Sequence, residues 1–513
     1  MADRTSLVPQ FTFPNTLQEQ EAALATNPLM QRLIESRATY TDDPHRPAYH
    51  YVNPEAMLND PNGLCYWQGH WHLFYQAYPP EDTRQHWGHA ISTDLVHWRD
   101  LPYCIYPDPE DKCFSGAALV EENRVIAMYH GTQAGNMVAI CDDPLLLNWT
   151  KVGDGAVISM PEPDASAPYT VFDPCIWKKD GRYYSLSAGT KPEGPAGKPV
   201  RANFLFESED LEHWTYLHPF VEDDAFTLVG DDGACPYFWP IGDRHILLFF
   251  SHMSGGQYLL GDYDTECDKF VVTNGGKFNF GAAWPSGVHA PSATPDGEGG
   301  VIVIFNMNAG KPTQRWNQIM TLPRRLRVSG DEISMEPAGD LESLRDAHQH
   351  FESIELPANE EIVMESVQGS SIELQAEIDP GNAPMLEMNV LRAPNREEYT
   401  RIAFFRDRGF SDRGGGTPRR QSLVSIDNSY SSCAPDVLSR APETAPVYLD
   451  ENERLKLRVF IDRSVVEVFI NGRQCVALRV YPERSDSLGV SFRAQGTSSR
   501  IHSLDAWQMK SIW

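Results

Sequence analysis

A short unit recurs along the first part of the chain and limits the fold more than any other feature of the sequence. Ser92–Trp98, Asp142–Trp149 and Ser208–Trp214 each combine an acidic residue, leucine and a final tryptophan, and each follows a strand-like run. Gly261–Phe270 is a fainter fourth copy. The aligned aromatic positions lie 51, 65 and 56 residues apart, which suits four-stranded propeller blades with repeats of about 40–50 residues. The repeat therefore predicts a β-propeller over residues 46–338.

The remaining segments differ in pattern from this repeat. Residues 1–45 hold apolar side chains at helical spacing, interrupted by Pro28, and predict one or two short helices outside the main domain. Residues 339–352 are expected to form a short helical linker. From residue 353 to 513, runs with alternating polarity such as Leu455–Ile461 predict strands of a β-sandwich. The expected fold class is all-β.

Length and charge narrow the range of functions. A chain of 513 residues can form two or more domains with sizeable cores. The net charge of −28 argues against nucleic acid or an anionic membrane as a partner, whereas a neutral small molecule is compatible. The nine cysteines show no metal-type spacing, and no run is long and apolar enough to suggest a signal peptide or membrane span. A reduced, cytoplasmic location is expected.

One acidic residue, Asp60, stands among turn-forming residues in the stretch Tyr51–Trp67. Asn59 precedes it and Pro61-Asn62-Gly63 follows. Two aromatic-rich runs separated by Gln68-Gly69 then predict a β-hairpin, which places Asp60 at the start of an inner strand. A carboxylate fixed there beside amide donors suits a nucleophile. For the Asp-Pro-Asn-Gly residues alone, a surface turn is the commoner explanation.

This stretch resembles the opening signature of glycoside hydrolase family 32, which contains invertases, levanases and inulinases. Further blocks of that family follow in the same order: Trp87–Trp98, Phe114–Ala117, Phe172–Pro174, Ala234–Pro236, Thr321–Arg324 and Val459–Phe469. The resemblance covers roughly residues 46–510. It implies a five-bladed β-propeller followed by a C-terminal β-sandwich, and a retaining activity on terminal β-D-fructofuranosyl units of sucrose or fructans. The implied partner is a small-molecule or oligosaccharide fructoside, with no metal and no organic cofactor.

The resemblance also implies roles for individual residues. A retaining glycosidase uses two carboxyl groups about 5–5.5 Å apart, one as nucleophile and one as acid/base. Asp60 matches the family's nucleophile, and Asp173 matches the carboxylate that binds sugar hydroxyls and stabilises the transition state. Asp173 taken alone would be a loop residue before proline. The positions matching further sugar contacts, stacking for the tryptophan and hydroxyl binding for the others, are Asn59, Gln76, Trp87 and Ser115.

The chain departs from the family pattern at two positions. The family's acid/base is a glutamate before Cys-Pro, where this chain has Ala234, and the family's arginine before Asp-Pro is replaced by Phe172. Alanine cannot transfer a proton. Because a cation beside an acid shifts its pKa, losing both together indicates a coordinated change. An inactivating substitution would account for Ala234 but not for Phe172.

Several residues are candidates for the missing proton donor. Asp232 is the nearest, since two residues back along a strand returns to the same face. It would stand about 6–7 Å away along the strand, and a bulge at Gly233 would shorten that gap. Asp231 is the second choice, and His252 and His289 are further candidates, with His289 also a possible substrate contact. The alternative is that the aspartates bind a turn and that each histidine is structural.

Other functions stay open at this stage. The altered pocket is compatible with a glycosidase or transferase for a different furanoside or a fructose anhydride. It is also compatible with a protein that binds fructosides without cutting them.

Overall fold

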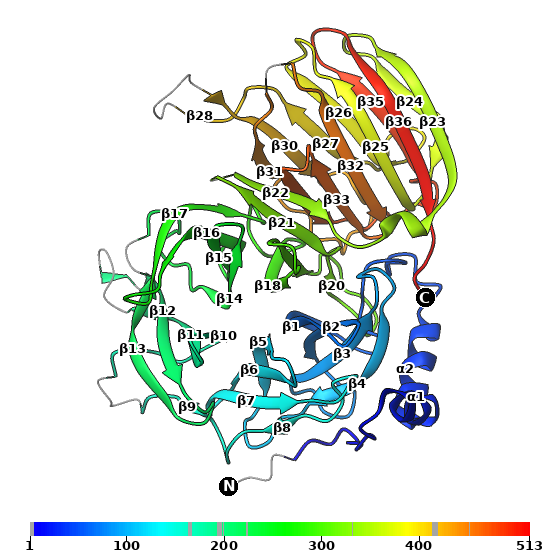
Figure 1. The fold of residues 1–513 in the computed structure, drawn as a ribbon. Helices are drawn as coiled ribbons and strands as arrows, with labels where there is room; N and C mark the ends of the chain where they lie inside the picture. Colours follow the sequence, from blue (N-terminus) through cyan, green and yellow to red (C-terminus); the bar gives the residue numbers. More distant parts are fainter. Residues whose placement is uncertain are drawn as a thin grey trace.

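A computed structural model of the chain describes residues 5–162, 167–191, 197–198, 200–221, 224–330, 332–412, 419–450 and 452–513. Two helices precede five small antiparallel sheets, and two larger sheets follow. Figure 1 shows the five small sheets arranged around a common centre, with the two larger sheets packed together beside them. The all-β prediction is confirmed. No helix within the described ranges is long and apolar enough to cross a membrane.

Each of the five small sheets is built from consecutive strands. The first contains β1 (Leu58–Trp67), β2 (His70–Ala77), β3 (His86–Ser92) and β4 (Arg99–Ile105). The second contains β5 (Cys113–Val120), β6 (Val125–Gly131), β7 (Gly135–Cys141) and β8 (Thr150–Lys151), with β9 (Ile158–Ser159) paired to β7. The third contains β10 (Pro174–Lys179), β11 (Arg182–Lys191), β12 (Val200–Ser208) and β13 (Trp214–Val221).

The fourth and fifth sheets complete this set. The fourth contains β14 (Ala234–Ile241), β15 (Arg244–Ser251), β16 (Gly255–Asp264) and β17 (Lys269–Lys277). The fifth contains β18 (Val288–Pro295), β19 (Val301–Met307), β21 (Arg324–Ser329) and β22 (Glu332–Pro337), with β20 (Ile319–Met320) paired to β19.

The repeated sequence unit is the turn between the third and fourth strands of a sheet. It joins β3 to β4, β7 to β8, β12 to β13 and, in its faint form, β16 to β17. In the first turn the Asp94 carboxylate accepts hydrogen bonds from the backbone N–H groups of Val96 and His97, at 2.9 and 2.8 Å. Leu95 adopts a positive φ of 66°. The aspartate is therefore placed to satisfy backbone donors that the sharp turn leaves unpaired.

The C-terminal part is a sandwich of two six-stranded sheets. One has the order β23 (Arg345–Leu356), β36 (Ser499–Met509), β25 (Ser371–Asp379), β32 (Leu455–Asp462), β33 (Val465–Ile470) and β34 (Gln474–Arg479). The other has the order β24 (Glu361–Gln368), β35 (Gly489–Ala494), β26 (Met385–Arg392), β27 (Thr400–Phe405), β30 (Ser422–Asp427) and β31 (Glu443–Val447). Buried aliphatic side chains from both sheets form the core between them. A small pair, β28 (Ser411–Asp412) and β29 (Arg419–Arg420), lies outside these sheets.

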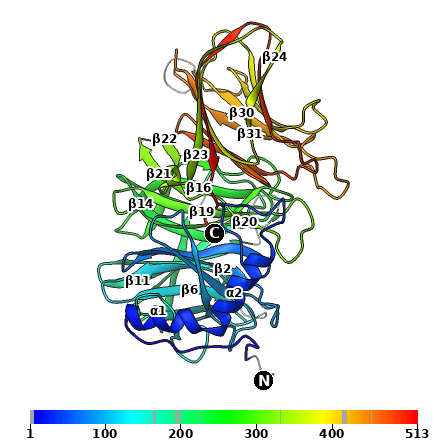
Figure 2. The ribbon, with the colours of Figure 1, turned by 90° about the vertical axis from the view of Figure 1, so that its right-hand side faces the viewer.

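The N-terminal helices and the linker agree in part with the sequence. Helices α1 (Leu17–Thr26) and α2 (Pro28–Thr39) are present, and Pro28 begins the second helix. Figures 1 and 2 place both on the outside of the first sheet, where Arg37 pairs with Asp100 of β4. In the predicted linker only η2 (Leu341–Leu344) is helical, because β23 begins at Arg345 and pairs with β36.

Two acidic residues of the sandwich bind the preceding sheets. The Asp462 carboxylate accepts hydrogen bonds from the backbone N–H groups of residues 48–50 at 2.7–2.9 Å. Glu467 accepts from the Leu322 N–H at 2.8 Å and pairs with Arg324 at 2.9 Å, with both charged side chains fully buried. The downstream sequence blocks therefore fix one domain against the other.

Candidate active site

Asp60 is buried in β1, the first strand of the first small sheet. It lies within an irregularity in the pairing of β1 with β2, between Leu58 and Pro61. Ser115 Oγ donates to Asp60 Oδ2 at 2.8 Å, and Gln76 Nε2 donates to the same oxygen at 3.3 Å. The predicted hairpin is confirmed, with Trp67 paired to His70 across the Gln68-Gly69 turn. The sequence thus correctly grouped Asp60, Gln76 and Ser115.

Asp173 lies directly before β10 and approaches Asp60 through a shared neighbour. The Cys235 N–H donates to Asp173 Oδ2 at 3.1 Å. The Cys235 Sγ atom lies 3.5 Å from Asp173 Oδ2 and 3.6 Å from Asp60 Oδ2. Asp173 is 3% exposed, and its Oδ1 atom has no hydrogen-bond partner among the described residues. Two buried carboxylates from separate sheets therefore converge, and one oxygen is left for a ligand.

The two carboxylates differ in their tendency to ionise. Burial raises the pKa of Asp60, but contacts with His289 and Ser115 outweigh it and hold that pKa below its usual value. Burial, followed by the charge of Asp60, raises the pKa of Asp173 to about 7. Such a separation is typical of carboxyl pairs that carry different roles in one site.

Phe172 and Ala234 belong to one apolar cluster beside this pair. Ala234 is fully buried with Cys235, Phe250 and Ala290, and Phe172 packs against the same group. The two positions at which the chain departs from the pattern that the resemblance implies are therefore in one neighbourhood. No proton donor is available from either side chain.

Asp232 interacts with His252 at the edge of the site. Its Oδ2 atom lies 2.5 Å from His252 Nδ1, and its Oδ1 atom accepts from the His252 N–H at 3.2 Å. The hydrogen bond that the His252 ring donates to Asp232 is the main factor that raises the pKa of His252, and the charges of Asp60 and Asp173 add to it. The pairing irregularity lies between Ala234 and Tyr237 of β14 and not at Gly233, where the bulge was predicted; Gly233 precedes the strand with a φ of 65°.

Asp231 and His289 occupy different positions. Asp231 accepts hydrogen bonds from the Leu228 N–H and the Ser254 hydroxyl, so it links the segment before β14 to the turn between β15 and β16. His289 Nδ1 lies 3.6 Å from Asp60 Oδ1. Its ring packs on Phe250, with the two ring centroids 4.1 Å apart. His289 therefore borders Asp60, as a substrate contact would.

The remaining predicted contacts divide into a polar network and a buried ring. Asn59 Nδ2 donates to Gln76 Oε1 at 3.3 Å, and Asn306 Nδ2 donates to Asn59 Oδ1 at 3.2 Å. Trp87 is fully buried, packs against Phe74 and donates its indole N–H to the Phe114 carbonyl. The prediction that Trp87 stacks on a sugar is therefore wrong, because the ring has no exposed face.

Sequence reasoning missed Cys235 and Asn306 as neighbours of Asp60, and it missed the pairing of Asp232 with His252. Cys235 adopts a φ of 49°, which turns its N–H and thiol toward the carboxylates. Asn306 comes from β19, far along the chain from Asp60. In the sequence, the one signal for Cys235 was its place in the Cys-Pro dipeptide after Ala234, and Asn306 had no signal.

Comparisons with known proteins agree with this geometry. The model for the glycosyl hydrolases family 32 N-terminal domain matches residues 50–337, and the family 32 C-terminal model matches residues 340–508. A levanase from Bacillus subtilis is 27% identical over 93% of this chain and 72% of its own length. A sucrose-6-phosphate hydrolase from Escherichia coli is 27% identical over 90% of this chain and 94% of its own length.

Solved structures show the same architecture. The fructan 1-exohydrolase IIa of Cichorium intybus superimposes with a TM-score of 0.79 at 22% identity, covering 91% of this chain and 98% of that chain. This similarity supports a propeller followed by a sandwich. Since two family models together span both parts of the protein, the chain belongs to glycoside hydrolase family 32.

Proposed function

We propose that this protein is a retaining glycosidase that releases terminal β-D-fructofuranosyl units from sucrose or fructans. The observation that carries the proposal is the meeting of Asp60 and Asp173 around one thiol, with their pKa values moved in opposite directions. Related proteins named levanase, sucrose-6-phosphate hydrolase and fructan exohydrolase support the substrate class. The five small sheets are the blades of a five-bladed propeller in this account.

Asp60 is the nucleophile in this proposal. A nucleophilic carboxylate must be ionised and held still, and the lowered pKa and the hydroxyl of Ser115 serve both needs. Asp173 is the stabiliser, because its unpartnered Oδ1 atom is available to accept from sugar hydroxyls at the floor of the site. Asn59, Gln76 and His289 complete the sugar contacts.

His252, held by Asp232, is the proton donor in this proposal. The Asp232 carboxylate orients the ring through Nδ1, which leaves Nε2 for the glycosidic oxygen, and it keeps the ring protonated to higher pH. The His252 side chain is 61% exposed, so it stands where a leaving group would depart. Asp232 thus acts through His252 and does not itself donate the proton.

A second function is favoured by one observation, the apolar surroundings of position 234. A fructoside-binding protein without catalysis needs no acid there, and Ala234 with Phe172 fills that space with apolar groups. A glycosidase or transferase for another furanoside or a fructose anhydride is compatible with the same change. Measuring turnover distinguishes the proposed glycosidase from a non-catalytic binding protein. Comparing rates on several furanosides distinguishes it from an enzyme with another substrate.

The test compares a substrate that needs protonation with one that does not. Sucrose requires a proton on its leaving oxygen, whereas β-D-fructofuranosyl fluoride has a good leaving group and depends on it far less. We expect Asp60→Asn to abolish release of fructose from both. His252→Gln should lose about 10²–10⁴-fold on sucrose but retain most of its first-turnover rate on the fluoride.

Controls distinguish the remaining outcomes. Asp173→Asn should lose rate on both substrates; selective loss on sucrose would make Asp173 the acid instead. His213→Gln removes another exposed histidine paired to an aspartate and should change neither rate. Binding of sucrose with no turnover of either substrate would support the binding protein.

We also propose a cytoplasmic location for the protein and keep the domain boundaries predicted from the sequence. All nine cysteines are free, as expected for a reducing compartment such as the cytoplasm. The division of the chain into domains stays a prediction, with segments 1–45, 46–338, 339–352 and 353–513.

A further inference from the structure

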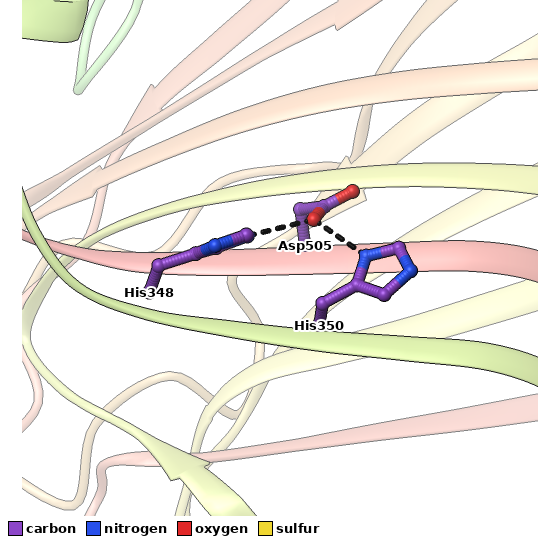
Figure 3. A group of neighbouring side chains, drawn as sticks. All are labelled: His348, His350 and Asp505. Carbon is purple, nitrogen blue, oxygen red and sulfur yellow. Dashed lines mark hydrogen bonds and ion pairs between the residues drawn. The ribbon is translucent and has the colours of Figure 1, made fainter.

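Three side chains with metal-binding chemistry meet on the sandwich, outside the candidate active site. Figure 3 shows His348 and His350 of β23 directed toward Asp505 of β36. His348 Nε2 lies 2.8 Å from Asp505 Oδ1, and His350 Nδ1 lies 2.7 Å from the same oxygen. The three donor atoms lie within 4.8 Å of one another.

The backbone of β23 explains why these donors share one face. His350 is paired directly with Asp505, which places their side chains on the same side of the sheet. The pairing is irregular between Asp346 and Gln349, and Ala347 has a φ of 45°. After this bulge, His348 and His350 are two residues apart along the strand, so their side chains lie on the same face.

Neighbouring groups hold both rings in place. His350 Nε2 lies 3.2 Å from Glu352 Oε1, which leaves Nδ1 to face Asp505. The His348 ring stacks on Trp507, with centroids 4.8 Å apart and planes at 5°. Histidines that bind metals commonly donate their second ring N–H to a carboxylate, and that contact fixes the ring.

We propose that His348, His350 and Asp505 bind one divalent transition-metal ion of the Zn²⁺, Co²⁺, Ni²⁺ and Cu²⁺ class. Two imidazoles and one carboxylate suit these ions, whereas Mg²⁺ and Ca²⁺ prefer oxygen ligands. The donors would separate slightly to hold an ion at about 2.0–2.2 Å from each.

Exposure and charge are compatible with this ion. The side chains of His348, His350 and Asp505 are 50%, 43% and 23% exposed, so an ion can enter from solvent and keep water ligands. Arg345, a cation whose charge interacts with Asp505, stacks on Trp507 and pairs with Glu373 at 2.7 Å, so part of its charge is compensated. The bound ion would link β23 to the C-terminal strand β36.

The experiment measures binding of the metal alone to the full chain. The protein is prepared without a histidine tag, stripped with chelator, and carries Cys267→Ser and Cys433→Ser to remove the two exposed thiols. Calorimetric titration with Zn²⁺ should give one equivalent, and Co²⁺ should give visible absorption bands of a nitrogen–oxygen site. His348→Gln, His350→Gln and Asp505→Asn should each weaken binding about tenfold or more.

Matched variants make the result decisive. His213→Gln, which alters an exposed histidine–aspartate pair with no second histidine, should leave binding unchanged. Glu352→Gln should weaken it less than loss of a donor. Zn²⁺ should raise the melting temperature of the parent but not of His350→Gln, whose metal-free melting curve reports its folding. Absence of Zn²⁺ binding by the parent at micromolar concentration would overturn the proposal. So would binding by His348→Gln and His350→Gln that is as tight as binding by the parent.

Discussion

Phe172 and Ala234 stand where the resemblance to family 32 implies an arginine and a glutamate. Both contribute to one apolar cluster with Phe250 and Ala290. A charge placed in that cluster alone would be buried without a partner, and such burial is costly unless the charge is paired. Opposite charges at both positions would be paired, and should therefore cost less stability than a charge at one position alone.

Restoring the acid alone should consequently destabilise the protein. We expect Ala234→Glu to lower the free energy of unfolding by about 3 kcal/mol, because the new carboxyl lies in an apolar site. The double variant Phe172→Arg with Ala234→Glu should recover much of that loss. Urea denaturation of both variants measures the difference; a fully stable Ala234→Glu protein would contradict the pairing.

The pH dependence of hydrolysis should report His252. Asp232 raises the pKa of this ring above its usual 6.5, so the ring keeps its proton, and its role as acid, to higher pH. The rate should fall as pH rises through that raised value. In Asp232→Asn the raising contact is weakened, and the alkaline limb of the profile for kcat/KM should move to lower pH. An unmoved limb would exclude His252 as the acid.

Single residues of the site were predictable to different degrees. Asp60, Gln76 and Ser115 follow from ordered motifs, and the structure brings them together. The Asp232–His252 contact was not predictable, since it depends on how the entry to β14 meets the end of β15. The prediction that Trp87 stacks on a sugar failed because every residue of β3 is buried, so an aromatic ring there belongs to the core.

Among the structural elements, the turn between the third and fourth strands of a small sheet recurs with an aspartate that binds its backbone. Asp210 repeats the contacts of Asp94, accepting from the Glu212 and His213 N–H groups at 2.9 and 2.8 Å. In this turn the Trp214 indole N–H also donates to the Leu211 carbonyl at 2.9 Å, so the aspartate and the tryptophan of the repeated unit both contact the backbone of the turn. The fifth small sheet does not show this pattern, because its third strand β21 ends at Ser329 and its fourth strand β22 begins at Glu332, which leaves no room for the unit.

Removing one turn aspartate should have a modest effect. Asp210→Ala deprives two backbone donors of their acceptor, but the turn is exposed and water can replace part of the loss. We expect a small decrease in the free energy of unfolding, of the same kind as loss of a helix cap. Glu212→Gln in the same turn is the control and should be nearly neutral. Equal stabilities by urea denaturation would contradict the assigned role.

For the whole molecule, the contact between the sandwich and the five small sheets depends on buried charges. Glu467 pairs with Arg324 and accepts from the Leu322 N–H, although neither charged side chain touches solvent. The sequence identified both blocks but not their meeting, which joins residues more than a hundred positions apart. Contacts of this range depend on how the domains pack.

Loss of that buried pair should be severe. Glu467→Ala leaves the Arg324 charge unpaired in the interior, and we expect a loss of about 3–5 kcal/mol in unfolding free energy. The exposed pair of Glu377 with Arg454 is the matched control, and Glu377→Ala should cost below about 1 kcal/mol. Similar losses in the two variants would show that burial of the Glu467 pair does not matter.

The central claim is that Asp60 forms a covalent bond to fructose although the family's glutamate is absent. The most direct measurement is mass spectrometry of peptides from His252→Gln protein quenched during turnover of β-D-fructofuranosyl fluoride. The account predicts a hexosyl adduct on the peptide containing Asp60, and none in the Asp60→Asn, His252→Gln double variant. No adduct under these conditions, or an adduct on another residue, would contradict it.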